Sequence, residues 1–184
     1  DQINAISLLA RLELAGVDVG PRWADVADHL ALRLADHVLP FLDLQYLYGL
    51  ARAGHTEAAR ALLHNITTHA ATRTEAHERT VWQQVCMPAA HGLLAHAQGD
   101  CATAAEKLGT ALPRLVEIGG SHAQRDLFHQ IWLDALQRNG QWAAVQNLLQ
   151  PLCNAQPQSA RLARQVRRVN QALGLPDPAP QDFE

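Results

Sequence analysis

The sequence predicts an all-α protein, a tetratricopeptide-like helical-repeat array of about nine antiparallel helices. Alanine and leucine dominate a chain of 184 residues in which aromatic residues make up only 5%, a composition that favours helices. Apolar residues recur every three or four positions, and no segment shows the two-residue alternation of a strand. Hydrophobic residues make up 48% of the chain, which is enough for one domain, expected over residues 1–175, with a sizeable core.

Four helices are expected in the first part of the chain, each bounded by a glycine or a proline. Gly16 ends the first helix, Pro40 lies beyond the end of the second, and Gly54 ends the third. The expected ranges are 3–15, 22–37, 42–53 and 56–71.

Five further helices follow a polar link, and prolines are expected to disturb two of them. Pro88 should kink or briefly break its helix, and Pro113 should disturb a last turn, because proline removes a backbone donor. The expected ranges are 77–98, 102–117, 121–139, 141–152 and 159–173. Residues 176–184, rich in proline and aspartate, are expected to form a disordered tail.

Three helix pairs share one pattern of small and apolar residues around a turn glycine. The turn glycines are Gly54, Gly99 and Gly140, spaced farther apart than the roughly 34 residues of an ordinary tetratricopeptide repeat. The pattern predicts degenerate repeat pairs that stack into a solenoid, with a capping helix at the end. The pairs cover about 41–71, 77–117 and 121–157, and the capping helix covers 159–173.

In such an array the first helix of each pair lines a groove that binds a protein or peptide. The pattern therefore predicts a binding surface on those helices, made of Tyr48, Arg52, Leu93, His96, Gln130, Asp134 and Gln137. Repeat domains that clamp a peptide carboxylate place lysine and asparagine in the groove. Lys107 is the only lysine here and belongs to an outer helix, so a carboxylate clamp is not expected.

A glycine-rich stretch opens the helix expected over residues 121–139. Gly119 and Gly120 predict a tight turn, and Ser121 with Gln124 predicts a capping box. Gln124 and Arg125 lie on or beside the apolar stripe of that helix, where a polar side chain needs a partner. Either Arg125 is latched to a carboxylate or carbonyl of a neighbouring helix, the interpretation we favour, or Gln124 and Arg125 both face a cleft that binds an anion or a carboxylate.

Two stretches resemble one known family. Residues 118–128, IGGSHAQRDLF, and residues 12–23 are similar to the tetratricopeptide repeat protein 38 family, and Pro88 and Pro113 fall where that family places prolines. The resemblance covers most of residues 8–157. It implies that the chain is the C-terminal half of a larger, bacterial-type member, and it brings no enzymatic activity, cofactor or partner.

The histidines allow a rival interpretation as part of an enzyme. His122, Asp126 and His129 share a helix flank at a spacing that could hold zinc. There is no HExxH motif and no obvious fourth ligand, so neither a metal nor another cofactor is expected. The rival is an enzyme with its site at the junction with an N-terminal half, using this flank or Arg125.

The cysteines and the lengths of the apolar runs indicate the cellular compartment in which the protein works. Cys86, Cys101 and Cys153 are an odd number without a CxxC motif, so we expect buried thiols in the reducing cytoplasm. No apolar run approaches the roughly 20 residues of a membrane span, and no signal peptide is visible, so no membrane partner is expected.

The last expected helix carries a basic stripe made of Arg161, Arg164, Arg167 and Arg168. Such a stripe could meet nucleic acid or an acidic partner. Because no aromatic residue interleaves the arginines, we expect a solvated face of a capping helix, and nucleic acid is not an expected partner. The net charge of −3 is too small to indicate such a partner.

Overall fold

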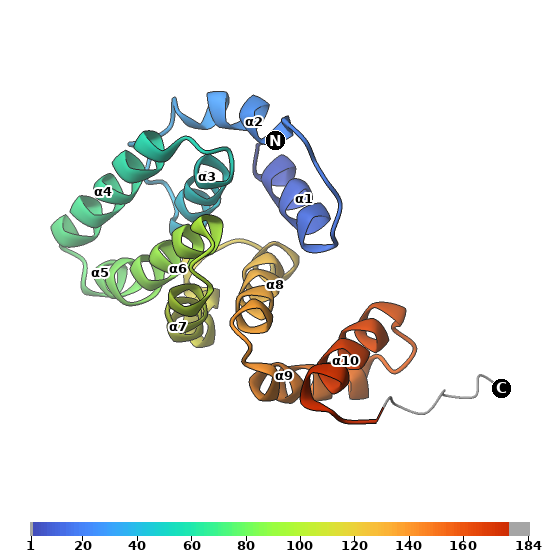
Figure 1. Cartoon of the computed structure of the whole chain (residues 1–184). Helices are drawn as coiled ribbons and strands as arrows, with labels where there is room; N and C mark the ends of the chain where they lie inside the picture. The colour runs from blue at the N-terminus through green and yellow to red at the C-terminus, as the bar shows by residue number, and fades with distance from the viewer. Residues whose placement is uncertain (1, 177–184) are drawn as a thin grey trace. The chain divides into compact units, whose positions relative to one another are not determined.

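The computed structural model describes residues 2–176, and over these residues it is helical without a strand (Figure 1). The expected all-α class is therefore confirmed for the described part of the chain. No helix in this part is both long enough and apolar enough to cross a membrane. The elements are α1 (Gln2–Leu14), α2 (Arg22–Leu30), α3 (Pro40–Arg52), α4 (Thr56–Thr72), α5 (Ala76–Val81), the π-helical η1 (Trp82–Cys86), α6 (Met87–Gln98), α7 (Cys101–Ala111), the 3₁₀-helical η2 (Leu112–Ile118), α8 (His122–Arg138), α9 (Trp142–Ala155) and α10 (Ala160–Leu173).

The second helix is shorter than predicted. The expected range extends to residue 37, but α2 ends at Leu30, and residues 31–39 form turns and irregular backbone. Leu34 kept the helical apolar spacing in sequence, yet its carbonyl accepts a hydrogen bond from the Asn65 side chain at 2.8 Å. His37 has a positive φ of 43°, which a continuing helix excludes.

Both prolines change the helix type near the positions where a disturbance was expected. Pro113 lies in the first turn of η2, so the helix predicted over 102–117 finishes as a tighter 3₁₀ segment. Before Pro88 the chain forms the wide turn η1, which α5 and α6 continue on either side without leaving helical geometry. The amide of Met87 bonds to the carbonyl of Trp82, five residues back. The expected break at Pro88 is therefore a π turn that ends just before it.

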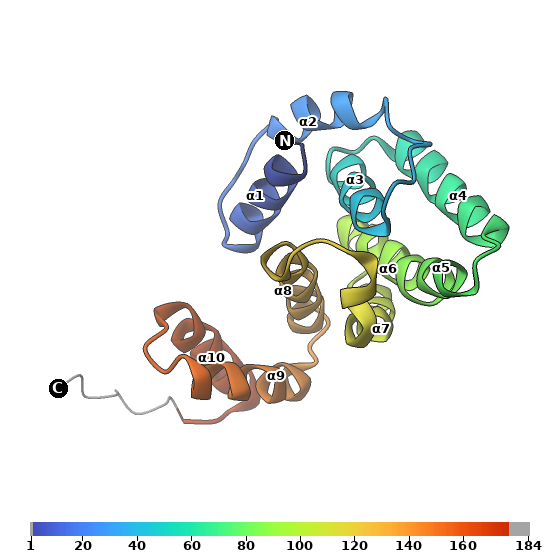
Figure 2. The same cartoon turned by 180° about the vertical axis from the view of Figure 1, so that it is seen from behind.

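The chain divides into two compact units, residues 1–135 and 136–184, with the boundary inside α8. The expected third pair, 121–157, thus contributes to both units. In the first unit α3 lies beside α4 and α6 in both views (Figures 1 and 2). Most of its residues are buried, and Phe41 meets Phe128 of α8 edge to face with ring centroids 6.1 Å apart.

Glycines allow the close packing of the helix pairs in the first unit. Gly54 and Gly99 adopt φ of 77° and 85° in the turns α3–α4 and α6–α7, a conformation that suits glycine. Inside α6, a Cβ atom on Gly92 would lie only 2.7 Å from Cγ of Leu108 on α7. The absence of a side chain at Gly92 therefore lets these two helices approach closely.

The second unit is a pair of helices, α9 and α10, that lie side by side in both views (Figures 1 and 2). The buried apolar side chains of these two helices are Val145 and Leu149 of α9 and Leu162 and Val169 of α10. Ser159 caps α10 by accepting a bond from the amide of Leu162. Apart from Pro176, the predicted tail 176–184 lies outside the described residues.

Candidate binding site

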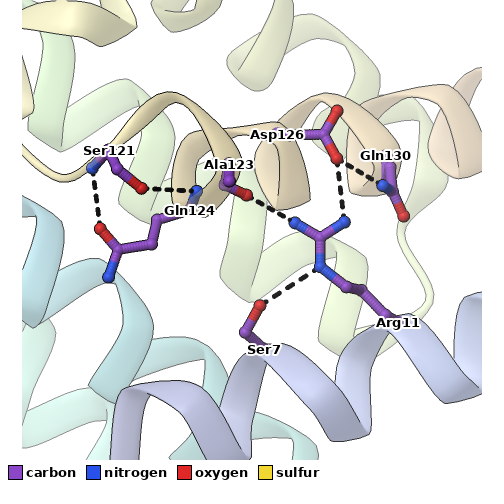
Figure 3. A network of polar contacts seen from close by, with 7 residues as sticks. All are labelled: Ser7, Arg11, Ser121, Ala123, Gln124, Asp126 and Gln130. Atoms are coloured by element: carbon purple, nitrogen blue, oxygen red, sulfur yellow. Dashed lines mark hydrogen bonds and ion pairs between the residues drawn. The ribbon is translucent and has the colours of Figure 1, made fainter.

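The glycine-rich turn before α8 forms the predicted capping box (Figure 3). The amide of Ser121 donates to Oε1 of Gln124 at 2.7 Å, and the amide of Gln124 donates to Oγ of Ser121 at 3.3 Å. Two backbone donors at the start of α8 are thus satisfied by side chains. Gln124 has a structural role here, although its position in the sequence also made it a candidate for binding.

Arg125 is half-buried and latched to the turn that precedes its own helix. Its Nη1 atom donates to the carbonyl of Gly119 at 3.2 Å and also to the carbonyl of Gly120. The expected latch is therefore present, but its partners are carbonyls of the preceding turn and not groups of a neighbouring helix. The reason is local: both glycines have positive φ, and their carbonyls lie within reach of a side chain one turn into α8.

A second polar network joins α8 to α1 (Figure 3). Arg11 donates from Nη1 to Oδ2 of Asp126 at 2.9 Å and from Nη2 to the carbonyl of Ala123 at 2.8 Å. Gln130 donates to the same Asp126 oxygen at 2.6 Å. Gln130 was expected to face a groove, and it instead supports this contact between helices.

The proposed metal flank on α8 does not gather its ligands. Asp126 is engaged with Arg11 and Gln130, as described above. Among residues 2–176, no group of three histidine, cysteine or acidic side chains is arranged to hold a metal ion. His122 and His129 therefore have no third ligand within the described chain.

Four of the seven predicted groove residues do come together in the first unit. Tyr48 of α3, His96 of α6 and Asp134 of α8 form one hydrogen-bonded chain. The Tyr48 hydroxyl lies 3.2 Å from Nδ1 of His96, and Nε2 of His96 lies 2.8 Å from Oδ2 of Asp134. Arg52, one turn after Tyr48, is ion-paired with Glu13 of α1 at 2.7 Å. We call these five residues the inner polar cluster.

The inner polar cluster has a buried end and a partly exposed end. Tyr48 and His96 are buried, whereas the side chains of Arg52, Glu13 and Asp134 are 26%, 24% and 27% exposed. Burial opposes the charge of Arg52, but its bond to Glu13, together with Tyr48 and Asp134 nearby, raises its pKa overall. A fixed cation and two carboxylates thus lie at the accessible end, where charge can be used in recognition.

The remaining two groove residues are buried and present little or no surface. Leu93 has no exposure at all and belongs to the apolar core, and Gln137 is 8% exposed. The repeat pattern placed Tyr48 and His96 in an open groove, whereas both side chains are buried. The face that carries them is covered by packing at these positions, because neighbouring helices lie against it.

Sequence reasoning missed a set of buried polar atoms near this cluster. Trp23 packs edge to face on Tyr48 with ring centroids 6.2 Å apart, and its Nε1 atom is buried without a protein partner. Both amide atoms of Gln45, one turn before Tyr48, are also buried and unpartnered. The signal was available in the spacing of Phe41, Gln45, Tyr48 and Arg52, which places all four on one face of α3.

A second buried polar group, also missed, lies where the 31–39 segment meets α3 and α4. Nδ1 of His37 lies 2.7 Å from Oδ2 of Asp43, and its ring packs on His69, with Trp82 adjacent. Burial raises the pKa of the Asp43 carboxyl, and the hydrogen bond from His37 opposes that effect. Burial is the main cause that raises the pKa of Cys86 well above its ordinary value, and the nearby Asp43 carboxyl adds to the effect. This thiol is therefore a poor nucleophile.

All three cysteines are free, and only Cys86 is buried, while Cys101 and Cys153 are partly exposed. The expectation of buried thiols therefore holds for Cys86 alone.

A search of protein-family models found no match to the chain, and no solved structure matches it.

Proposed function

We propose that the chain is a non-catalytic interaction module of the tetratricopeptide repeat type, related to the tetratricopeptide repeat protein 38 family, and that it binds a protein or peptide segment. Support for the family comes from residues 118–128 and 12–23. Support for the repeat type comes from the helix pairs α3–α4 and α6–α7, each closed by a left-handed glycine. The three free cysteines are compatible with work in the reducing cytoplasm.

The observation that carries the proposal is the inner polar cluster. Three successive first helices, α3, α6 and α8, contribute Tyr48, His96 and Asp134 to one hydrogen-bonded chain. The buried part fixes the side chains, and the accessible part offers the Arg52 guanidinium and two carboxylates. A rigid constellation with both signs of charge suits a polar or zwitterionic peptide segment better than a purely apolar one.

The test compares the ion pair between α3 and α1 with an ion pair within α4. The inner variant is Arg52→Gln with Glu13→Gln, and the matched control is Arg60→Gln with Glu57→Gln, an exposed pair on α4. Each double substitution removes one ion pair and leaves the net charge unchanged. Peptides selected from a displayed random library on the full chain serve as probes, and titration calorimetry gives their affinities. We expect the inner variant to weaken binding about tenfold or more and the control to change it less than about twofold.

Two results would contradict this proposal. One is a selected peptide whose affinity is unchanged in the inner variant although circular dichroism shows the variant folded. The other is an equal loss in both variants, which would assign the binding surface to some other face.

The rival function, an enzyme site near His122, Arg125, Asp126 and His129, has less support. Arg125 is engaged by two carbonyls, and Asp126 by Arg11 and Gln130. These contacts account for Arg125 and Asp126, two of the four polar residues that motivated the rival. Both residues are better explained as parts of the joint between α1, the glycine turn and α8.

A further inference from the structure

The second unit has an unusual charge composition. Residues 136–176 contain five arginines and no lysine, aspartate, glutamate or histidine. In the first unit, by contrast, many arginines are neutralised locally, since Arg11, Arg33, Arg52, Arg60 and Arg114 each pair with a carboxylate. The described part of the second unit therefore contains arginines but no carboxylate side chain of its own.

Four of these arginines form one face of α10. At 100° per residue, Arg161, Arg164, Arg167 and Arg168 span a sector of about 120°. Leu162 and Val169, which are buried, point to the opposite side. All four arginines are exposed, and none of them forms an ion pair with another residue that the structure describes. We call them the arginine face.

An aromatic residue lies beside the arginine face. The guanidinium carbon of Arg168 is 5.9 Å from the ring centroid of Trp142, which begins α9 and is half-exposed. The sequence suggested that no aromatic residue accompanies the stripe, because none occurs between the arginines. The packing of α9 on α10 brings one in from 26 positions before Arg168 (168 − 142).

We propose that the arginine face and Trp142 bind single-stranded nucleic acid. Guanidinium groups match phosphate oxygens in planar, bidentate contacts, and a neighbouring aromatic side chain offers a stacking partner for an unpaired base. Exposed arginines without neutralising carboxylates are the charge pattern that releases counterions from a phosphate backbone. An acidic protein segment would use the same charges but would gain little from Trp142. This inference concerns a surface and a ligand separate from those of the proposed function.

The test measures binding of the full chain to a fluorescein-labelled oligouridine by fluorescence anisotropy between 25 and 200 mM salt. Four phosphate contacts at about 0.7 ions each predict a slope of roughly −3 for log affinity against log salt. Arg161→Gln with Arg164→Gln should lower affinity at low salt about tenfold or more and flatten the slope by about 1 to 1.5. Trp142→Leu should lower affinity roughly tenfold through lost stacking.

The matched control is Arg33→Gln with Arg60→Gln, which removes the same charge from two exposed arginines of the first unit. It should leave affinity within about twofold of the parent chain. Circular dichroism confirms that each variant keeps its helices. The proposal is overturned by any of three results: no binding at 25 mM salt, equal weakening by the control, or tighter binding of a polyglutamate peptide of equal charge with no effect of Trp142→Leu. The last result would assign the arginine face to an acidic protein partner.

Discussion

Arg11 and Asp126 form a 2.9 Å ion pair across 115 positions of sequence, and Arg11 also bonds to the Ala123 carbonyl and to Ser7 (Figure 3). One guanidinium thus ties α1 to the first turns of α8. The geometry resembles a clamp more than a simple surface pair, because three acceptors share a single planar group. This joint holds α1 to one of the two stretches on which the family resemblance depends.

Arg11→Met should lower the free energy of unfolding by about 1 kcal/mol, since it keeps the aliphatic stem and removes the bonds. For a chain of this size the loss corresponds to a Tm decrease of roughly 2–4 °C, measurable by calorimetry. Arg60→Met is the control, because Arg60 makes only an exposed pair with Glu57 on one helix. Equal Tm values for the two variants would show that the joint contributes no more than a surface ion pair.

Arg125→Ala should destabilise the protein by about 1–2 kcal/mol, because it leaves the Gly119 and Gly120 carbonyls without this donor. The measurement is urea unfolding followed by circular dichroism. Arg79→Ala provides the comparison, since Arg79 is exposed on α5. Unchanged stability of Arg125→Ala would return Arg125 to the list of candidate ligand-binding groups.

Gly120→Ala should cost about 2–3 kcal/mol of stability. The new Cβ would lie 3.0 Å from the Phe41 ring, at a φ of 75°. Gly140→Ala is a close match, with a φ of 73° and no atom within 4 Å of its Cβ, so it should cost only about 1 kcal/mol. The free energy of unfolding is measured for both glycine variants and for Gly120→Ala combined with Phe41→Leu. The comparison separates the cost of the contact with the Phe41 ring from the cost of the positive φ. If the two glycine variants lose the same stability, the ring has moved aside at no cost.

Stability should fall as the pH drops below 6.5, in part because of His69. Burial is the main cause that lowers the pKa of His69 from 6.5, and the nearby Arg73 and His37 side chains lower it further by electrostatic repulsion. The unfolded chain therefore takes up a proton at a higher pH than the folded one. The contribution of His69 to the free energy of unfolding is complete above pH 6.5. It is lost as the pH falls towards the pKa of His69 in the folded chain, by at most about 1.4 kcal/mol per pH unit.

Thermal unfolding of wild type and His69→Gln between pH 7.5 and 5 measures this contribution as the difference in slope. His64→Gln, an exposed histidine of the same helix, controls for the loss of an imidazole. The raised pKa of Asp43 acts with the opposite sign, because that carboxyl gains relative stability as it is protonated. Parallel curves for wild type and His69→Gln would rule out His69 as the source.

Local signals in the sequence predicted most of the helices and their turns. Gly54 and Gly99 mark helix ends, and Ser121 with Gln124 marks a helix start, through backbone chemistry that depends only on near neighbours. The end of α2 was missed because Leu34 continues the helical spacing, whereas its carbonyl bonds to α4.

The sites depended on contacts between distant residues, which sequence patterns give only in part. The repeat pattern assigned Tyr48, His96 and Asp134 to one groove, and the three side chains do meet, but the pattern could not show that two of them are buried. The Arg11 clamp and the meeting of Trp142 with Arg168 have no local signal at all, since each requires knowing which helices are neighbours.

The wide turn η1 keeps a long apolar stripe in phase with the helix that carries it. From Val81 to Leu93 the buried residues recur every four positions, as Val81, Val85, Ala89 and Leu93 and again as Trp82, Cys86 and Ala90. In a regular α-helix of 3.6 residues per turn, such a stripe would rotate about 40° with each repeat and leave the core. One π turn absorbs an extra residue and returns the stripe to the same side. Deleting Gln83 or Gln84, the two exposed residues of η1, would therefore remove the extra residue, and a regular α-helix would then keep Val81 and Leu93 within about 20° of the same side.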